Sequence, residues 1–267
     1  YDLFRNRIIF PIKNAQGKVI GFSGRIYQAS ETEPKYVNSP FTQIFTKGEV
    51  LYNLDKAIPI MKQMKRVVLY EGFLDVIASV RAGVNEAIAT MGTALTIEQA
   101  RLIKKHTDNI ILCYDGDSAG FEAMMKAIQI LENEKLMVNL VVLPEKLDPD
   151  EYVKKYSLEK YREYINTQQI DPFEFKYQYL RKHSDLKRAG GIERFKLSVF
   201  DLIKDTSAMV SELYLKKLAT NTSVDFQTVK TDYRDYQLSK AITKNQNDAK
   251  QKMIHIAISN KYVLAET

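Results

Sequence analysis

Carboxylate side chains directly follow two short apolar runs in the middle of this chain. Val67–Tyr70 is followed by Glu71, and Ile110–Tyr114 is followed by Asp115-Gly116-Asp117. Such runs are typical of buried parallel strands, whose carboxyl ends line the ligand-binding crevice of an open α/β sheet. Carboxylates gathered at one edge repel one another unless cations neutralise them. Because oxygen ligands without nearby Cys or His favour Mg²⁺ or Mn²⁺ over zinc, we expect a divalent-metal site suited to phosphoryl chemistry.

Three further carboxylates could reach the same edge. Asp75 lies on the first turn after Glu71, where it could bind metal or only complement a helix dipole, and both readings stay open. Asp148 and Asp150 follow another apolar run, with Pro149 fixing the turn between them. We expect at least one of the two to bind metal, although either could instead cap the helix that follows.

The Asp-x-Asp pattern is weak evidence when taken alone. It recurs in haloacid-dehalogenase-like phosphatases, glycosyltransferases and calcium loops. The dehalogenase pattern usually has Thr or Val at the position of Ala119, and a calcium loop needs further ligands where Ala119–Phe121 stands. The combination with Glu71 is therefore more informative than either part.

Alternating strands and helices are expected to position these residues. Apolar runs and helical spacing predict strands at 67–70, 86–90, 110–114 and 138–143, with helices at 73–82, 96–106 and 119–132. Strands that alternate with helices imply βαβ crossovers and a parallel sheet flanked by helices.

The flanking regions differ from this central part. Before it, a hairpin (8–12 and 19–22) and a helix (53–64) predict a small mixed α/β segment, and after it the strands stop. The expected class is therefore α/β plus α, with regions 1–65, 66–170, 171–243 (helical) and 244–267 (a linker and the possible start of another region). The expected helices of the third region are 173–182, 191–205, 209–220 and 225–236.

Composition narrows the function classes. The single Cys of the 267 residues excludes an internal disulfide, and Cys113 is expected to be a core residue. The three scattered His residues form no zinc pattern, and we expect neither a signal peptide nor a membrane-spanning segment. The net charge is +6, yet residues 66–150 carry eight basic and thirteen acidic side chains. An acidic centre between basic flanks is suited to a polyanionic partner.

The arrangement of Glu71 and Asp115-Gly116-Asp117 resembles the TOPRIM domain, which is shared by bacterial primases, topoisomerases and some nucleases. The segments around it resemble the catalytic core of bacterial DnaG-type primases over roughly residues 1–170. The helical region resembles this family only in kind. The segments that carry the resemblance are 4–12, 21–25, 34–40, 45–52 and 90–94.

The resemblance implies a primase, which makes RNA primers on a single-stranded DNA template from NTPs. A 3′-hydroxyl would attack the α-phosphate of the incoming NTP, with two or more Mg²⁺ or Mn²⁺ ions at the acidic centre. Asp115 and Asp117 are the expected ligands, and Glu71 is a ligand or the general base. A basic groove is expected to hold nucleotide and template, and in the family also alarmones of the (p)ppGpp type. The expected groove residues are Arg7, Arg25, Lys35, Tyr36, Asn38 and Lys47.

The same resemblance implies a replicative helicase as partner and a place at the bacterial replication fork in the cytoplasm. Because the chain starts without Met and has one Cys, we expect a fragment that lacks the family's zinc-binding domain and most of the helicase-binding domain. Such a fragment is expected to bind nucleotide but to initiate poorly. Two alternatives remain at this stage: a TOPRIM topoisomerase or nuclease, and a non-catalytic scaffold for single-stranded DNA and helicase.

Overall fold

The computed structural model describes residues 3–28, 32–116 and 118–242. The chain forms two compact units, Tyr1–Phe175 and Lys176–Thr267. The segments predicted as separate regions, 1–65 and 66–170, thus belong to one unit. Asp117 and the predicted linker at 244–267 lie outside the described residues.

The first unit begins with an antiparallel sheet in the order β1-β2-β3, formed by Arg7–Lys13, Val19–Ile26 and Tyr36–Asn38. Asn14 closes the turn between β1 and β2, because its Oδ1 accepts hydrogen bonds from the backbone N–H groups of Gln16 (3.1 Å) and Lys18 (3.0 Å). Gly17 has a φ of +78°, which favours glycine. The predicted hairpin is confirmed.

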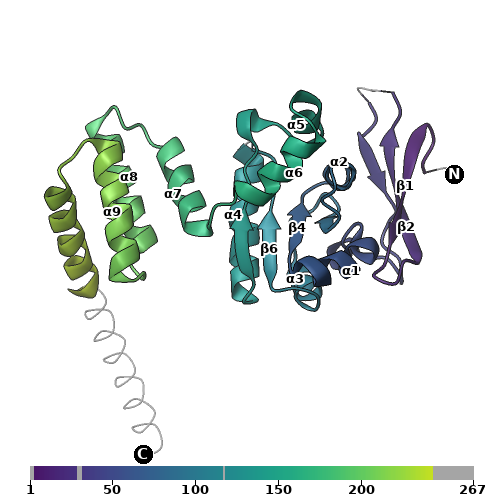
Figure 1. Ribbon diagram of the computed structural model, residues 1–267, viewed down its shortest axis with the longest axis horizontal. Helices are drawn as coiled ribbons and strands as arrows, with labels where there is room; N and C mark the ends of the chain where they lie inside the picture. Colours follow the sequence, from purple (N-terminus) through teal and green to yellow (C-terminus); the bar gives the residue numbers. More distant parts are fainter. Residues whose placement is uncertain (1–2, 29–31, 117, 243–267) are drawn as a thin grey trace, which may run out of the picture. The chain divides into compact units, whose positions relative to one another are not determined.

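The second sheet is parallel and has the order β5-β4-β6-β7, and its central strands β4 and β6 are labelled in Figure 1. It confirms the predicted alternation, but β6 ends two residues and β7 three residues earlier than predicted. β6 ends at Leu112 and β7 at Leu140, because their pairings with the neighbouring strands end there. The segments that carry Cys113, Tyr114 and the acidic loop therefore leave the sheet sooner. The strands are β4 (Val67–Tyr70), β5 (Ala87–Ala89), β6 (Asn109–Leu112) and β7 (Met137–Leu140).

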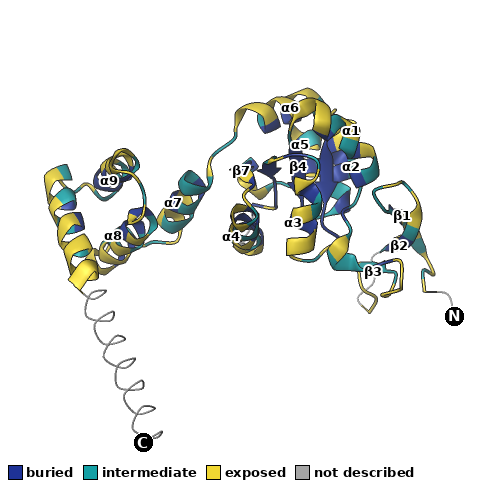
Figure 2. Ribbon diagram, turned by 90° about the horizontal axis from the view of Figure 1, so that it is seen from below, coloured by how far each residue is buried: buried dark blue, intermediate teal, exposed yellow. Residues whose placement is uncertain are grey.

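Helices cover the parallel sheet, and strands β4 and β5 are buried along their whole length (Figure 2). On one face, Val68 and Tyr70 pack with residues of α2, α5 and α6. The hydroxyl of Tyr161 in α6 lies 2.8 Å from that of Tyr70 and 2.9 Å from Ser79 Oγ in α2. The helices are α1 (Leu54–Met64), α2 (Phe73–Arg81), α3 (Ile97–Lys104), α4 (Ser118–Asn133), α5 (Pro149–Lys155) and α6 (Leu158–Thr167), with short turns η1 (Lys47–Glu49) and η2 (Pro144–Lys146).

Phe73, the first residue of α2, joins the two sheets. Its ring centroid lies 4.7 Å from that of Phe10 in β1, 5.6 Å from Tyr36 in β3 and 5.4 Å from Tyr52. Because α2 begins directly after the carboxyl end of β4, this cluster holds one face of the antiparallel sheet near the acidic edge.

The second unit is helical, as predicted. It contains most of α7 (Pro172–Lys182), then α8 (Ala189–Ile203), α9 (Ala208–Thr222) and a helix over 226–242. The rings of Tyr177, Phe195 and Tyr214 are buried in its core. Across the residues that the structure describes, no helix is both long and apolar enough to cross a membrane.

Candidate active site

A cavity of about 630 Å³ in the first unit brings together most of the residues predicted to do chemistry. Its acidic lining comes from the carboxyl side of the parallel sheet, and most of its basic and polar lining comes from β2, β3, the residue before β3, and η1. The predicted residues that line it are Arg25, Lys35, Tyr36, Asn38, Lys47, Asp115, Asp148 and Asp150, and Asp75 lines it as well.

Strand register places the two acidic segments at one edge. Leu69 of β4 pairs with Leu112 of β6 in parallel, so Glu71 and Asp115 both follow the carboxyl ends of adjacent strands. Glu71 is half-buried, and the Thr90 hydroxyl donates a hydrogen bond (3.1 Å) to its backbone carbonyl. Asp115 is exposed and lines the cavity, whereas Glu71 does not line it.

The pKa of Asp75 is affected by the negative charge of this edge. Burial, followed by the carboxylates of Asp115 and Asp148, raises the pKa of Asp75 to about 7. Glu71 adds to this rise, and the Gly72 N–H opposes it by donating to Asp75 Oδ2 across 3.2 Å. The helix-dipole role is thus observed, since the carboxylate accepts the Gly72 N–H at the start of α2, and metal binding by Asp75 stays a prediction.

Asp148 and Asp150 line the cavity but also have local partners. Asp148 caps α5, because its Oδ1 accepts a hydrogen bond from Glu151 N (2.7 Å) while Glu151 Oε2 accepts one from Asp148 N (3.1 Å). Asp150 pairs with Lys154 Nζ at 2.5 Å. The capping alternative is thus observed for Asp148.

The acidic edge fits a divalent cation in donor type and charge. Its donors are carboxylate oxygens, which hard cations prefer. The pKa of Asp75 is raised first by burial and then by repulsion from Asp115 and Asp148, and a cation would relieve that repulsion. Among the described residues, no three His, Cys, Asp or Glu side chains are grouped closely enough to hold a metal ion. Asp117, a predicted ligand, lies outside those residues.

The basic wall is built around Tyr36. Arg25 Cζ and Lys35 Nζ each lie 5.8 Å from the centroid of its ring. Burial raises the pKa of Tyr36, the Arg25 charge opposes this rise, and Asp75 and Asp148 add to it. In such an arrangement the cations can hold phosphates, and the aromatic ring can stack on a base.

Known proteins with similar sequences and folds are primases. Residues 1–58 match the family described as "DNA primase catalytic core, N-terminal domain", and residues 68–153 match the "Toprim-like" family. A DNA primase from Halalkalibacterium halodurans is 39% identical over 245 residues, which are 90% of this chain and 40% of that protein. The Escherichia coli primase catalytic core is 32% identical, with a TM-score of 0.64 over 84% of this chain and 72% of that one.

The chain belongs to the DnaG-type primase family. A DnaG primase catalytic domain whose structure was solved with bound single-stranded DNA is 33% identical, with a TM-score of 0.65 over 82% of this chain and 71% of that one. The family membership confirms the resemblance inferred from the motifs. The chain spans about 40% of the length of the curated DnaG-type relatives that it matches first.

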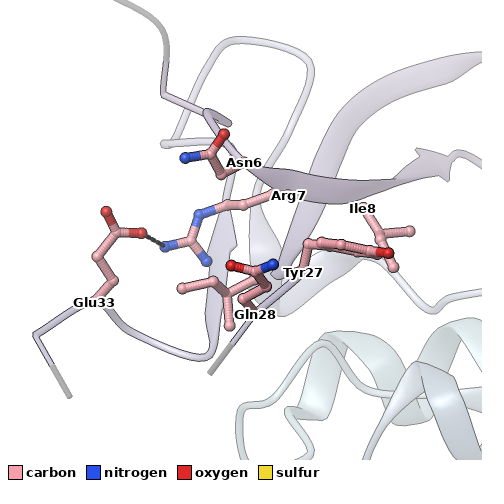
Figure 3. Close-up of a pocket in the computed structure, with 7 residues that line it drawn as sticks. Asn6, Arg7, Ile8, Tyr27, Gln28 and Glu33 are labelled. Carbon is pink, nitrogen blue, oxygen red and sulfur yellow. Dashed lines mark hydrogen bonds and ion pairs between the residues drawn. The ribbon is translucent and has the colours of Figure 1, made fainter. Parts of the chain in front are cut away.

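Arg7 lies apart from the other predicted groove residues of this DnaG-type chain, and its predicted binding role stays untested. Arg7 does not line the central cavity; it lies in a separate cavity of about 590 Å³, shown in Figure 3. There its guanidinium donates to the Pro34 carbonyl (2.8 Å) and pairs with Glu33 (3.3 Å), and only 4% of its side chain is exposed. Arg7 pairs with Ile26 and Ile8 pairs with Arg25, so strand alternation puts Arg7 and Arg25 on opposite faces of the sheet.

Among the lining residues of the central cavity that were not predicted from the sequence, two have polar or charged side chains. Ser23 lies two residues before Arg25 on β2, and Arg81 ends α2. Alternation along β2 could have identified Ser23, since residues i and i+2 share a face. Helical spacing could have identified Arg81, because Leu74, Ile77, Ala78 and Arg81 lie on one side of α2 and all line the cavity.

Proposed function

We propose that this chain is the catalytic part of a primase, which synthesises short RNA primers on single-stranded DNA from NTPs. The observation that carries the proposal is the central cavity, in which the basic face around Tyr36 stands opposite the carboxyl edge of the parallel sheet. A binder of polyanions gains nothing from a carboxylate edge, so this arrangement favours catalysis over the scaffold alternative. Family membership favours it over a topoisomerase or nuclease.

In this proposal Glu71, Asp115 and Asp117 hold Mg²⁺ or Mn²⁺, and Asp148 and Asp150 are further candidate ligands. Two bound cations would stabilise the charge on the attacking and leaving oxygens of phosphoryl transfer. The protein groups bind and orient: Arg25, Lys35 and Lys47 offer cations to phosphates, and Tyr36 offers a ring for stacking. Glu71 is the candidate general base for the primer 3′-hydroxyl.

The proposed partners follow from the same site and from the family. Because a DnaG relative has been solved with single-stranded DNA, we propose that class of template for this chain. A replicative helicase is the proposed protein partner, and alarmones such as (p)ppGpp are proposed inhibitors at the basic groove. The proposed location is the bacterial replication fork in the cytoplasm. A zinc site is proposed only for the separate amino-terminal domain of this family.

Metal-dependent incorporation of labelled NTPs on a single-stranded template tests the proposal. The chain is expected to extend a short annealed RNA primer in Mg²⁺ or Mn²⁺ and to stop when a chelator is added. Primer extension avoids reliance on initiation, which is expected to be poor. Cleavage or relaxation of supercoiled DNA without any NTP incorporation would instead support the topoisomerase or nuclease alternative.

A further inference from the structure

Four residues form a square on the face of the antiparallel sheet that lines the central cavity. On β2, Ser23 and Arg25 alternate with Gly24, and on β3, Tyr36 and Asn38 alternate with Val37. Ser23 pairs with Asn38 and Arg25 pairs with Tyr36 across the two strands. Cross-strand partners share a face of the sheet, and all four side chains line the cavity. Asn38 is one of the groove residues predicted from the sequence, whereas Ser23 is the member of this square that was not predicted.

Two polar atoms at one side of the square form no hydrogen bond with the part of the chain that the structure describes. Ser23 Oγ and Asn38 Oδ1 are both buried, and neither forms a hydrogen bond within the described residues. Leaving such atoms unsatisfied costs about 1–3 kcal/mol each. A nearby serine behaves differently, since Ser39 Oγ accepts a hydrogen bond from Phe22 N at 2.9 Å. Unsatisfied atoms at the wall of a cavity indicate a ligand that completes them.

The types of these atoms restrict that ligand. Asn38 Oδ1 can only accept a hydrogen bond, so its partner must donate one, and a hydroxyl such as Ser23 Oγ can donate or accept. Ionised phosphate oxygens only accept and cannot satisfy Asn38 Oδ1. A sugar hydroxyl both donates and accepts, so one such group can serve both atoms.

The neighbouring pair suits the rest of a nucleotide. Arg25 and Tyr36 lie two residues along the strands from Ser23 and Asn38, which corresponds to about 7 Å. Cations for phosphates therefore lie within one nucleotide of the unsatisfied pair. We propose that Ser23, together with Asn38, hydrogen-bonds a ribose hydroxyl of the bound nucleotide and so selects ribonucleotides over deoxynucleotides. This inference rests on the proposed function.

Equilibrium binding of ATP, 2′-deoxy-ATP and 3′-deoxy-ATP in the presence of Mg²⁺ tests the inference without primer synthesis. The wild-type chain is expected to bind ATP more tightly than one of the deoxy forms. The variant Ser23→Ala is expected to reduce that preference by about two- to tenfold, the value of one neutral hydrogen bond. Its affinity for the discriminated deoxy form is expected to stay unchanged. Repetition with GTP, CTP and UTP separates sugar from base contacts, because a sugar contact affects all four equally.

The matched control is Ser39→Ala, which removes a hydroxyl from the residue directly after β3, outside the cavity. It is expected to lower thermal stability, because Phe22 N loses its acceptor, and to keep the sugar preference. Ser23→Ala is expected to keep or raise the thermal stability of the nucleotide-free chain, because it removes a buried hydroxyl that has no hydrogen bond among the described residues. A sugar preference that survives in Ser23→Ala, or its absence in the wild type, would overturn the inference alone. Failure of the wild type to bind any nucleotide would overturn the proposed function as well.

Discussion

Leu69 of β4 and Leu112 of β6 are paired in parallel register, and this pairing brings Glu71 and Asp115 to the same edge of the sheet. The two carboxylates are far apart in the sequence, and only the crossover between adjacent parallel strands makes them neighbours. Phe73 then fixes the antiparallel sheet against the start of α2, so Tyr36 and its cations face that edge. An acidic wall and a basic wall thus enclose one cavity.

Asp75 is expected to make the metal-free protein less stable as the pH rises from about 4 to 7. Its pKa is about 7 in the folded chain against an ordinary value of 3.8, so the folded state binds more protons than the unfolded state in this window. The stability that protonated Asp75 contributes is fully present below the ordinary pKa of 3.8, and it is lost as the pH rises through the folded-state pKa of about 7. Asp75→Asn is expected to raise the free energy of unfolding above pH 7 by up to about 4 kcal/mol, since a tenfold change in proton affinity is worth about 1.4 kcal/mol.

Urea unfolding with chelator present, at about pH 5 and about pH 8, measures this effect. The control is Asp108→Asn, which changes an exposed carboxylate at the opposite end of β6. The explanation fails if Asp75→Asn and Asp108→Asn shift the stability equally at both pH values.

Arg7 and Arg25 are expected to have separate effects, because they lie on opposite faces of one sheet. Arg7→Ala removes a buried side chain that donates to Pro34 O, and should lower stability by about 1–3 kcal/mol while nucleotide affinity is kept. Arg25→Ala should weaken nucleotide triphosphate binding by about tenfold or more, the value of a charged hydrogen bond, with little effect on stability. Thermal unfolding and nucleotide titration of both variants check this. If Arg7→Ala lost nucleotide affinity while its stability stayed unchanged, Arg7 would instead be a nucleotide-binding residue.

The acidic edge could be predicted from the sequence because each apolar run ends abruptly in carboxylates. The side of Arg7 could not be predicted without the register of the hairpin, since a shift of one residue moves every side chain of a strand to the other face. Nothing in the sequence distinguishes Ser23 from other serines. It stands out only because its Oγ is buried and forms no hydrogen bond within the described residues. The dual position of Asp148, capping α5 and lining the cavity, also needed the structure.

The buried hydroxyl cluster of Tyr70, Ser79 and Tyr161 is expected to stabilise the packing of α2 and α6 on the sheet. Tyr161→Phe leaves the other two hydroxyls without this partner, and should lower the free energy of unfolding by about 1–3 kcal/mol. Tyr70→Phe combined with Tyr161→Phe should cost less than the sum of the single changes, because the two residues share one hydrogen bond. Chemical denaturation of the three variants measures this coupling, and strict additivity would argue against the cluster.

Tyr164→Phe is the matched control for that series. It removes a hydroxyl from the same helix, α6, that donates to the Val142 carbonyl at 3.2 Å in a half-buried position. Its cost is expected to be smaller than that of Tyr161→Phe, because water can reach the site. A larger cost for Tyr164→Phe would contradict the importance assigned to the buried cluster.

Direct titration of Mn²⁺, followed by electron paramagnetic resonance, tests the acidic edge without reliance on primer synthesis. The wild-type chain is expected to bind Mn²⁺. Changing a residue that only contacts a metal ligand typically weakens metal binding by about 10- to 100-fold. Because Asp115 is itself a proposed ligand, Asp115→Asn is expected to weaken Mn²⁺ binding by more than this. Asp108→Asn, at the other end of the same strand, should bind as the wild type does. Equal Mn²⁺ affinity in the wild type and Asp115→Asn would contradict the metal site from which the proposed function is built.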